Sequence, residues 1–389
     1  MDDIKRLVAE NKEYMIRHRR ELHRIPETSY TEKKTSSYVA ERLRELGLKV
    51  QTGLAQFGVV GLLEINRPGP TLLIRADMDA LPIKEETGLP FASTHEGAMH
   101  ACGHDGHMAM ALGAAKVLSA LKDRLKGNIK FVFQPAEEGP GGARPMIEQG
   151  VMENPHVDYS VGCHLWPFIP EGTLGVKAGP LMAAMDRFDL KIIGRGGHGA
   201  MPHTCLDAID VAVQVINALQ RIVSRQMNPL NPTVVSVCSF HAGTAFNITA
   251  GQAELAGTTR TFDREIWDSW TSRMDKIVRG VCEAMGAKYE LNYQQNYPPL
   301  LNDPQMAEVV RRCAALVAGR EKVIEPEPTM GGEDMAFYLE KSKGCFFFLG
   351  VGREGCATIH NPKFDFNEEV LLTGMETYCR VGMDLLGQA

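Results

Sequence analysis

Apolar and polar positions alternate with two different periods in the first hundred residues. Residues 3–22 and 31–46 carry apolar side chains at helical spacing beside charged faces, and the second stretch ends at Gly47, a residue type that often caps helices. Residues 58–65 and 71–76 contain the short apolar runs of β-strands. The pattern predicts an α/β domain with a central sheet flanked by helices.

The same alternation continues further along the chain. A stretch rich in Ala, Met and Leu predicts a packed helix over 107–122, and apolar runs predict strands over 128–133, 159–163 and 345–349. Polar residues follow these strands, and open α/β sheets bind their ligands outside the carboxyl ends of the strands. We therefore expect one edge of the sheet to collect the side chains of Asp77, Asp79, Glu137, Glu138, His164 and His360.

The pattern changes between residues 183 and 296. It predicts elements in the order β-α-β-β-α-β, at 187–193, 207–225, 233–241, 251–259, 264–285 and 288–293. This order is the ferredoxin-like split pattern of a complete small α+β domain. Pro298 and Pro299 mark its exit. We therefore predict a discontinuous catalytic domain over 1–182 and 297–389, with a second domain inserted at 183–296.

Composition narrows the function classes. The 389 residues carry a net charge of -6, which argues against a nucleic-acid partner because no basic stripe is available to replace counterions. The chain starts with a charged amphipathic stretch and has no apolar run of spanning length, so we expect no membrane partner and a cytoplasmic location. The nine cysteines, an odd number without framework spacing, fit reduced thiols.

The densest candidate chemistry lies at residues 100–107, which read His-Ala-Cys-Gly-His-Asp-Gly-His. Three imidazoles, a thiol and a carboxylate within eight residues indicate a metal site for Zn or its first-row neighbours. The alternative is a polar loop that opens a helix, with His100 and His107 as cap or surface residues. The cluster cannot close a metal site alone, so further ligands are expected elsewhere in the chain.

Glu137 and Glu138 are the most informative pair after that cluster. Neighbouring residues in a turn point in different directions, so one carboxylate can bind a metal while the other faces the water that the metal holds. A carboxylate beside such a water is the arrangement of a general base. The alternative is a pair of solvated surface acids. Their position after an apolar strand and before a glycine-rich loop favours the catalytic interpretation.

These motifs resemble those of a known family. The chain is similar to the di-metal amidohydrolase and carboxypeptidase clan that includes aminoacylase, and most closely to the branch of hippurate hydrolase and the hydrolases of auxin-amino acid conjugates. The motifs that carry the resemblance are RADMDALP at 75–82, HACGHDGH at 100–107, QPAEE at 134–138, GCH at 162–164, GGED at 331–334 and IHN at 359–361. They occur in the family's order over nearly the whole chain.

The resemblance implies two divalent metal ions, of Zn, Mn, Co or Ni, in each subunit. The metal ligands that it implies are Cys102, His104, Glu138, His164 and His360. Cys102 would bridge the ions, with Glu138 and His360 completing one site and His104 and His164 the other. Glu137 would be the general base, and Asp79 would orient a ligand. Asp77 is not in the ligand set, although other branches have a histidine ligand in its place.

The inserted domain contributes further implied site residues. By the resemblance, His198 reaches the active site of a neighbouring subunit and stabilises the oxyanion, so the inserted domain would be a dimerisation or lid domain of a homodimer or a larger assembly. Asn247 and Arg260 match positions that bind the substrate carboxylate. Phe246-Asn247-Ile248 is followed by Thr249 and Ala250, whereas Ile-Pro is common at these two positions in the family. This difference changes the expected shape of the carboxylate pocket.

The resulting prediction is an enzyme that hydrolyses the amide bond of N-acyl amino acids. One alternative is a dipeptidase or carboxypeptidase on the same scaffold, which would need an anionic partner for the free α-amino group of a dipeptide. Another is a catalytically inactive binding protein, which would be expected to have a broken ligand set. We also expect a low-pKa thiolate at Cys102, and hence sensitivity to oxidants, once the metal is removed.

Overall fold

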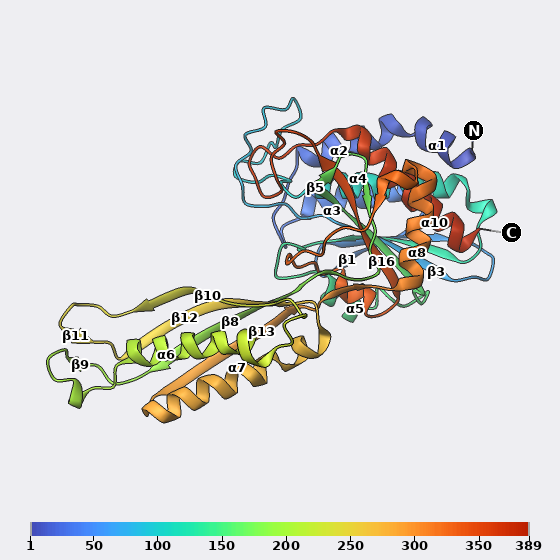
Figure 1. The fold of residues 1–389 in the computed structure, drawn as a ribbon. Helices are drawn as coiled ribbons and strands as arrows, with labels where there is room; N and C mark the ends of the chain where they lie inside the picture. Colours follow the sequence, from blue (N-terminus) through green and yellow to red (C-terminus); the bar gives the residue numbers. More distant parts are fainter. Residues whose placement is uncertain (1, 388–389) are drawn as a thin grey trace. The chain divides into compact units, whose positions relative to one another are not determined.

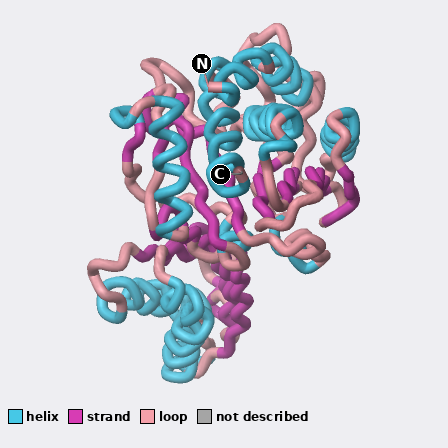
Figure 2. The backbone as a smooth tube through the Cα atoms, turned by 90° about the vertical axis from the view of Figure 1, so that its right-hand side faces the viewer, coloured by secondary structure: helices cyan, strands magenta, loops and turns pink. Residues whose placement is uncertain are grey.

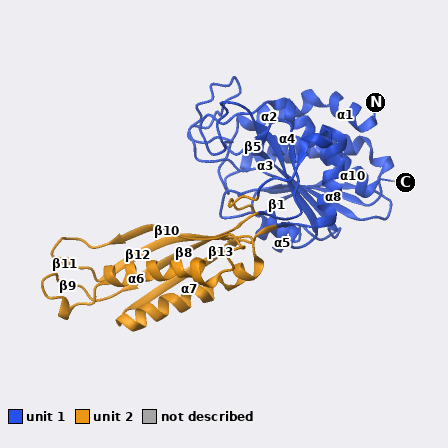
Figure 3. Cartoon of the chain, viewed as in Figure 1, with its two compact units in different colours: residues 1–181, 301–327, 334–389 blue, residues 182–300, 328–333 orange. Residues whose placement is uncertain are grey.

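A computed structural model describes residues 2–387, and the chain forms two compact units (Figure 3). Unit 1 comprises Met1–Leu181, Leu301–Glu327 and Asp334–Ala389, and unit 2 comprises Met182–Leu300 and Pro328–Glu333. Unit 2 is therefore inserted into the sequence of unit 1. Each unit has its own apolar core.

Unit 1 is built on an eight-stranded sheet (Figure 1). In spatial order the strands are β1 (Lys49–Leu54), β2 (Gly58–Glu64), β4 (Asn128–Gln134), β3 (Thr71–Asp77), β5 (Tyr159–Pro170), β16 (Lys343–Gly352), β6 (Leu174–Gly175) and β15 (Val323–Ile324). The central strands β4, β3, β5 and β16 run parallel to one another. Every residue of β3 is buried, as expected for a strand covered on both faces.

Helices lie on both sides of this sheet (Figure 2). They are α1 (Asp3–Glu10), α2 (Lys12–His23), α3 (Lys33–Glu45), α4 (His104–Ala120), α5 (Ala143–Glu148), α8 (Pro304–Ala318), α9 (Ala336–Leu339) and α10 (Leu371–Leu386). Helix α4 is buried on nearly all sides, which its Ala-, Met- and Leu-rich sequence allows. It packs against α2, α10 and β3, so its first turn, where the HACGHDGH motif ends, is held inside the core.

Unit 2 has an antiparallel four-stranded sheet with two helices. The sheet order is β10 (Thr233–Ala242), β12 (Gln252–Thr261), β8 (Ala184–Ile193) and β13 (Lys288–Tyr297), and the helices are α6 (Ala208–Arg221) and α7 (Arg264–Met285). Alternate residues of β8 are buried, because one face of the sheet packs against the helices (Figure 2). The predicted fold class, a central α/β sheet flanked by helices with an inserted ferredoxin-like unit, is confirmed.

Two short strand pairs complete the fold. Strands β9 (Gly197–His198) and β11 (Ile248–Thr249) pair in unit 2, and β7 (Gly179–Met182) pairs with β14 (Leu300–Asn302). A Cβ at Gly199 would lie 3.1 Å from the carbonyl oxygen of Asn247. The glycine-rich sequence around His198 therefore allows the two chain segments to approach closely.

Several predicted boundaries differ from the structure. The helix expected over 3–22 is interrupted at Asn11, whose side-chain amide donates to the carbonyl oxygen of Leu7 and closes α1. The helix expected from residue 107 already begins at His104. Strand β1 was not predicted, since it is an edge strand with mostly exposed side chains.

His164 was expected to follow a strand. It lies inside β5 instead. The apolar run stops at residue 163, yet β5 continues to Pro170 because β16 keeps pairing with it. The prediction that every candidate ligand follows a strand end is therefore wrong for His164. Among the described helices, none combines the length and the apolar character that a membrane crossing requires.

Candidate metal centre

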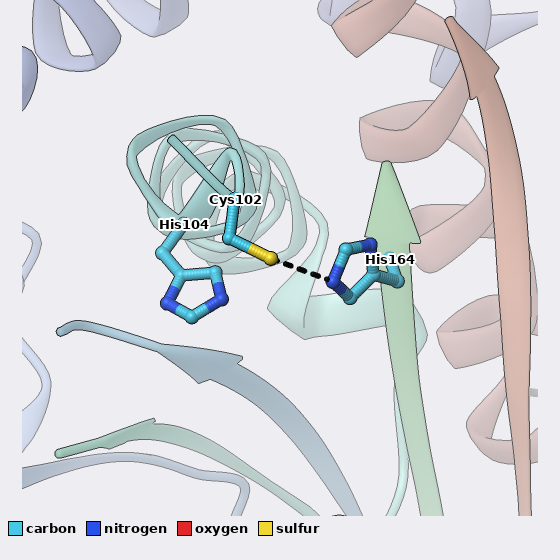
Figure 4. Close-up of side chains that lie close together, drawn as sticks. All are labelled: Cys102, His104 and His164. Atoms are coloured by element: carbon cyan, nitrogen blue, oxygen red, sulfur yellow. Dashed lines mark hydrogen bonds between the residues drawn. The ribbon is translucent and has the colours of Figure 1, made fainter. Parts of the chain in front are cut away.

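Two groups of metal-capable side chains share one residue. The donor atoms of Cys102, His104 and His164 all lie within 4.8 Å of one another (Figure 4), and so do those of Cys102, Glu138 and His360. The Sγ atom of Cys102 lies 3.3 Å from Nε2 of His164. All five residues of the predicted ligand set are therefore brought together, with the thiol common to both groups.

The loop before α4 directs Cys102 and His104 into this space. Gly103 has a φ of 86°, in the left-handed region, and a Cβ there would lie 3.0 Å from Leu165 Cδ1. The left-handed backbone favours glycine here, and a larger residue would also have to displace the Leu165 side chain. With this turn, His104 becomes the first residue of α4 and its ring nitrogen Nδ1 donates to the carbonyl oxygen of Asp79 at 2.8 Å. The proton on Nδ1 leaves the lone pair of Nε2 available to a cation.

Asp79 also holds the two adjacent acids. Its Oδ1 accepts from the amide of Glu137 and its Oδ2 from the amide of Glu138, both at 3.0 Å. Its Oδ2 accepts a further hydrogen bond from the Ser29 hydroxyl at 2.8 Å. Asp79 therefore fixes the His104 ring through its carbonyl oxygen and the backbone of both glutamates through its buried carboxylate. Because the Asp79 carboxylate holds the backbone amides of Glu137 and Glu138, the side chains of these two glutamates start from defined positions.

The loop that carries the glutamates is braced by residues that have no motif of their own. Ala136 has a φ of 57°, and its amide donates to Glu32 Oε1 at 2.8 Å. Glu32 is fully buried, and burial raises its pKa to about 7. The side chain of Glu32 was not among the predicted site residues.

Asp334, from the GGED motif, closes the other end of the same loop. It accepts hydrogen bonds from the amides of Gly142 and Ala143 at 3.0 Å and from Arg75 and Gln134 at 2.8 Å. The motif was recognised from the sequence, but no role was assigned to this residue. Its hydrogen bonds explain why a carboxylate is buried there.

His360 lies opposite Glu138 on the second donor group. Its φ is 62°, an uncommon backbone state for a histidine, and its amide donates to the carbonyl oxygen of Ala101 at 2.8 Å. Its Nε2 lies 3.1 Å from Glu138 Oε1, an oxygen that makes no hydrogen bond. Two metal-binding atoms that lie this close without a hydrogen bond between them are arranged as two ligands of one ion would be. Strained backbone of this kind is common at functional sites.

The electrostatics of the site favour a cation. Nε2 of His104 is buried without a hydrogen-bond partner. Although burial opposes protonation, the carboxylates of Asp77 and Asp79 raise the pKa of His104 to about 10. The same negative charges would stabilise a metal ion bound at Nε2. The described residues therefore fit a metal centre in both geometry and charge.

The two remaining donors behave differently. Burial, together with His107 and His104, holds the pKa of His164 well below its usual range, which keeps its imidazole neutral and able to coordinate. Burial, Glu138 and Glu137 hold the pKa of Cys102 well above its usual range. The expectation of a low-pKa thiolate after metal removal is therefore wrong. A thiolate at this position needs a cation beside it.

The alternative interpretation of the cluster expected His100 and His107 to be cap or surface residues. The structure buries both of them. Their exposed fractions are 1% and 0%. Neither ring nitrogen of His100 has a hydrogen-bond partner, whereas His107 lies in a third metal-capable group with Asp77 and His104. The position of Asp77 within this group, next to one predicted ligand, is a contact that the motif alone did not specify.

Of the predicted substrate residues of unit 2, His198 and Asn247 lie close together, but Arg260 is apart from them. His198 and Asn247 lie by the β9–β11 pair, beyond the end of β12 that begins at Gln252, whereas Arg260 lies near the other end of that strand. Arg260 lies eight positions after Gln252 along the strand, which is roughly 26 Å at about 3.3 Å per residue. Within one chain, His198 and Arg260 therefore cannot contact the same small substrate.

His198 and Arg260 also differ in their surroundings. Nδ1 of His198 accepts from the amide of Ala200 at 3.1 Å, so the proton of a neutral ring is on Nε2, which can donate outwards. Arg260 is partly buried and donates to the carbonyl oxygens of Thr259 at 2.9 Å and Met330 at 3.2 Å. His198 is thus an exposed donor, while Arg260 already has partners within unit 2.

A buried thiol, two buried imidazoles and paired carboxylates at the edge of an α/β sheet are typical of metal-dependent hydrolases. Comparison with known proteins gives the family. The chain belongs to peptidase family M20/M25/M40, whose model matches residues 73–384. The resemblance that the motifs indicated is therefore confirmed, and the protein is a hydrolase of this family.

Individual relatives cover most of the chain. An N-acyl-L-amino acid amidohydrolase of Geobacillus stearothermophilus is 49% identical over 77% of this chain and 81% of its own length. Thermostable carboxypeptidase 1 of Saccharolobus solfataricus is 41% identical over 96% of each chain. A solved structure from Bacillus subtilis, described as a dinuclear metal binding peptidase of the M20 family, is 35% identical, covers 97% of this chain and 99% of its own, and has a TM-score of 0.83. Dinuclear metal binding thus occurs in the family.

Proposed function

We propose that the protein hydrolyses the amide bond of N-acyl amino acids, releasing a carboxylic acid and a free amino acid. The observation that carries this proposal is the pair of donor groups that share Cys102, with buried Glu137 beside them. The relative that is 49% identical is named for this activity. A small anionic substrate suits a centre that contains cations.

The proposal assigns two divalent ions, of Zn, Mn, Co or Ni, to the two groups. His104 and His164 would hold one ion, Glu138 and His360 the other, and the Cys102 sulfur both. When bound, such ions polarise the amide carbonyl and acidify water. The soft sulfur and the imidazoles suit first-row transition metals better than Mg²⁺ or Ca²⁺.

Glu137 is the proposed general base. Its side chain is 6% exposed, its amide is fixed by Asp79, and a carboxylate oxygen lies within 4.8 Å of donor atoms of His104 and Glu138. Glu137 takes the proton from the attacking water and passes it to the nitrogen of the leaving amine. Asp79 positions both Glu137 and His104 and does not itself exchange a proton.

We further propose that the working form is a homodimer or a larger assembly. His198 presents its Nε2 proton to the active site of a neighbouring copy and donates to the oxyanion. Asn247, which lies beside His198 at the β9–β11 pair, enters the same site. Arg260 binds the substrate carboxylate. The separation of His198 from Arg260 along unit 2 supports two chains per site, because one chain cannot direct both residues to one substrate. The proposed compartment is the cytoplasm.

A second function, carboxypeptidase or dipeptidase activity, is favoured by the relative named thermostable carboxypeptidase 1. Both activities share the metal centre and the base. They differ at the α-amino group, which is acylated in N-acyl amino acids and charged in dipeptides. A charged amine requires an anionic partner, whereas an acyl group requires apolar or neutral surroundings.

The test is a substrate panel assayed with the metal-free protein after addition of Mn, Co, Ni or Zn. Hippurate and N-acetyl amino acids represent the first function, and unblocked dipeptides with the same C-terminal residues represent the second. We expect metal-dependent release of the amino acid from the acylated series. Faster turnover of the dipeptides would favour the peptidase. Metal binding without turnover of either series would indicate a binding protein.

A further inference from the structure

Strand β5 loses one of its neighbours just before the predicted ligand His164. The pairing between β3 and β5 ends at Arg75 and Gly162. Beyond that point the amide of Leu165 donates not to a strand but to Nε2 of His107, at 2.9 Å. A side chain from the first turns of α4 therefore replaces a strand as the partner of β5.

Asp77 fixes the state of that histidine. Oδ1 of Asp77 accepts from Nδ1 of His107 at 2.7 Å, and Oδ2 of the same carboxylate accepts from Arg75 at 2.7 Å. Since Nδ1 carries the proton, Nε2 has the lone pair that accepts from Leu165. Both ring nitrogens are thus used, and His107 has no lone pair left for a cation. The group formed by Asp77, His104 and His107 is therefore not a third metal site.

Leu165, whose amide His107 holds, also orients His164 through its carbonyl oxygen. Nδ1 of His164 donates to the carbonyl oxygen of Leu165 at 2.7 Å, and its Nε2 points to Cys102 Sγ. Leu165 is held at its amide by His107 and contacts the His164 ring through its carbonyl. A shift of the Leu165 backbone would consequently turn the His164 ring away from Cys102. Every side chain in this series is buried.

We infer that His107 is a positioning residue that aims His164 at the metal centre through the backbone of Leu165. The series runs from Arg75 and Asp77 through His107 to Leu165. It gives Asp77 a function without making it a ligand. The inference rests on the proposed function only in assigning a metal ion to His164. The hydrogen bonds themselves do not depend on that assignment.

The test compares His107→Gln with His107→Leu. A glutamine can accept from Leu165 through its oxygen and donate to Asp77 through its nitrogen, whereas leucine fills similar space and does neither. Each protein is loaded with Zn, and the metal retained is measured by mass spectrometry as the chelator concentration rises. We expect His107→Leu to lose metal at about 10- to 100-fold lower chelator, as other partners of ligating residues do. His107→Gln should stay within about threefold of the native protein.

His18→Leu is the matched control. His18 is as buried as His107 and is hydrogen-bonded to Tyr38, between α2 and α3, away from the metal-capable residues. Its loss should lower thermal stability and leave metal retention unchanged. Equal retention in His107→Leu and native protein would overturn the inference. Equal loss in the Leu and Gln variants would make His107 itself a ligand, which also contradicts it.

A measurement on the native protein keeps the inference testable if His107→Leu does not fold. In metal-free protein with ¹⁵N-labelled histidine, the ring of His107, assigned by its absence from His107→Gln, should be neutral with the proton on Nδ1. A proton on Nε2 would rule out acceptance from Leu165 and overturn the inference. Failure of the proposed function is a separate result: the native protein would then bind no stoichiometric metal, whatever the state of His107.

Discussion

Glu32 accepts a hydrogen bond at 2.8 Å from the backbone amide of Ala136, whose φ of 57° places it in the left-handed region. The residue after Ala136 is the proposed base, Glu137. A non-glycine residue in this conformation is held there by its surroundings, because the isolated backbone disfavours it. The position of the proposed base therefore depends on a carboxylate more than a hundred residues earlier in the chain.

Replacing that carboxylate should lower the rate without lowering metal content. Glu32→Met keeps the volume and removes the acceptor, and misplacement of Glu137 should reduce kcat by about 10- to 100-fold while KM changes little. Glu32→Gln keeps an oxygen for the Ala136 amide and should stay within about threefold of native kcat. Steady-state kinetics and metal analysis of both variants check this. Native kcat in Glu32→Met would show that the loop holds itself.

The proposed base gives the sharpest test of mechanism. Glu137→Gln should retain metal at the native level, because the assigned ligands are unchanged, and turnover should fall by at least ~100-fold. Metal analysis and turnover of one preparation provide the check. Joint loss of metal and activity would move Glu137 into the ligand set, and retained activity would exclude it as the base.

Variants of Cys102 and Cys163 distinguish metal coordination from packing. Cys102 is common to both donor groups, whereas Cys163 is part of the apolar core of unit 1. Cys102→Ala should therefore bind both ions far more weakly, and Cys163→Ala should keep them while losing some stability through the small cavity that it creates. Metal stoichiometry and thermal unfolding distinguish the two. Equal stoichiometry in both variants would exclude a bridging thiolate.

Mixing two inactive proteins tests whether His198 acts across subunits. His198→Ala should keep its metal and lose catalytic rate, since an oxyanion donor acts as charge develops. After subunit exchange with Glu137→Gln, about half the dimers are mixed and each has one intact site, so activity should recover to at most roughly a quarter of native. Exchange is verified with two affinity tags. If exchange is complete and no activity returns, His198 does not act in trans.

His23 should make the stability of the protein depend on pH. Although burial opposes it, Asp105 and Glu85 raise the pKa of His23 to about 9. Because the folded pKa exceeds the unfolded value of about 6.5, the stabilisation is complete below pH ~6.5 and is lost as pH rises through about 9. It amounts to about 3 kcal/mol at most.

His23→Gln removes that titration and is the reference for the measurement. The free energy of unfolding of native protein and variant, from urea denaturation at fixed metal content, should differ most near pH 6 and converge above pH ~9. A difference that stays constant across this range would show that His23 does not titrate between the two states. The enzyme assay is not needed for this test.

The candidate metal ligands could be proposed from sequence because their residue types are chemically unusual and because their motifs resemble those of a known family. Cys102 and His104 stand two residues apart, and Glu138 and His360 belong to short motifs. The residues that hold these donors could not be predicted in the same way. Glu32 binds a backbone amide of a distant loop, and any residue type except proline at position 136 would present that amide. No local pattern therefore marks it.

The same difference explains the errors in the fold. An apolar run shows where side chains enter a core, so the boundaries of β3 and β4 were close to those observed. The length of β5 depends instead on pairing with β16, whose partner residues lie far away in sequence. His164 consequently appeared to follow a strand, although the strand continues past it.

The single sulfur shared by the two donor groups makes their occupancy interdependent. If Cys102 holds both ions, the first ion to bind has to displace the proton of a thiol whose pKa is raised, and the second ion then meets a thiolate that is already formed. Filling would then be cooperative, and partly filled molecules would be scarce. The protein would then change from metal-free and inactive to fully loaded over a narrow range of free metal concentration.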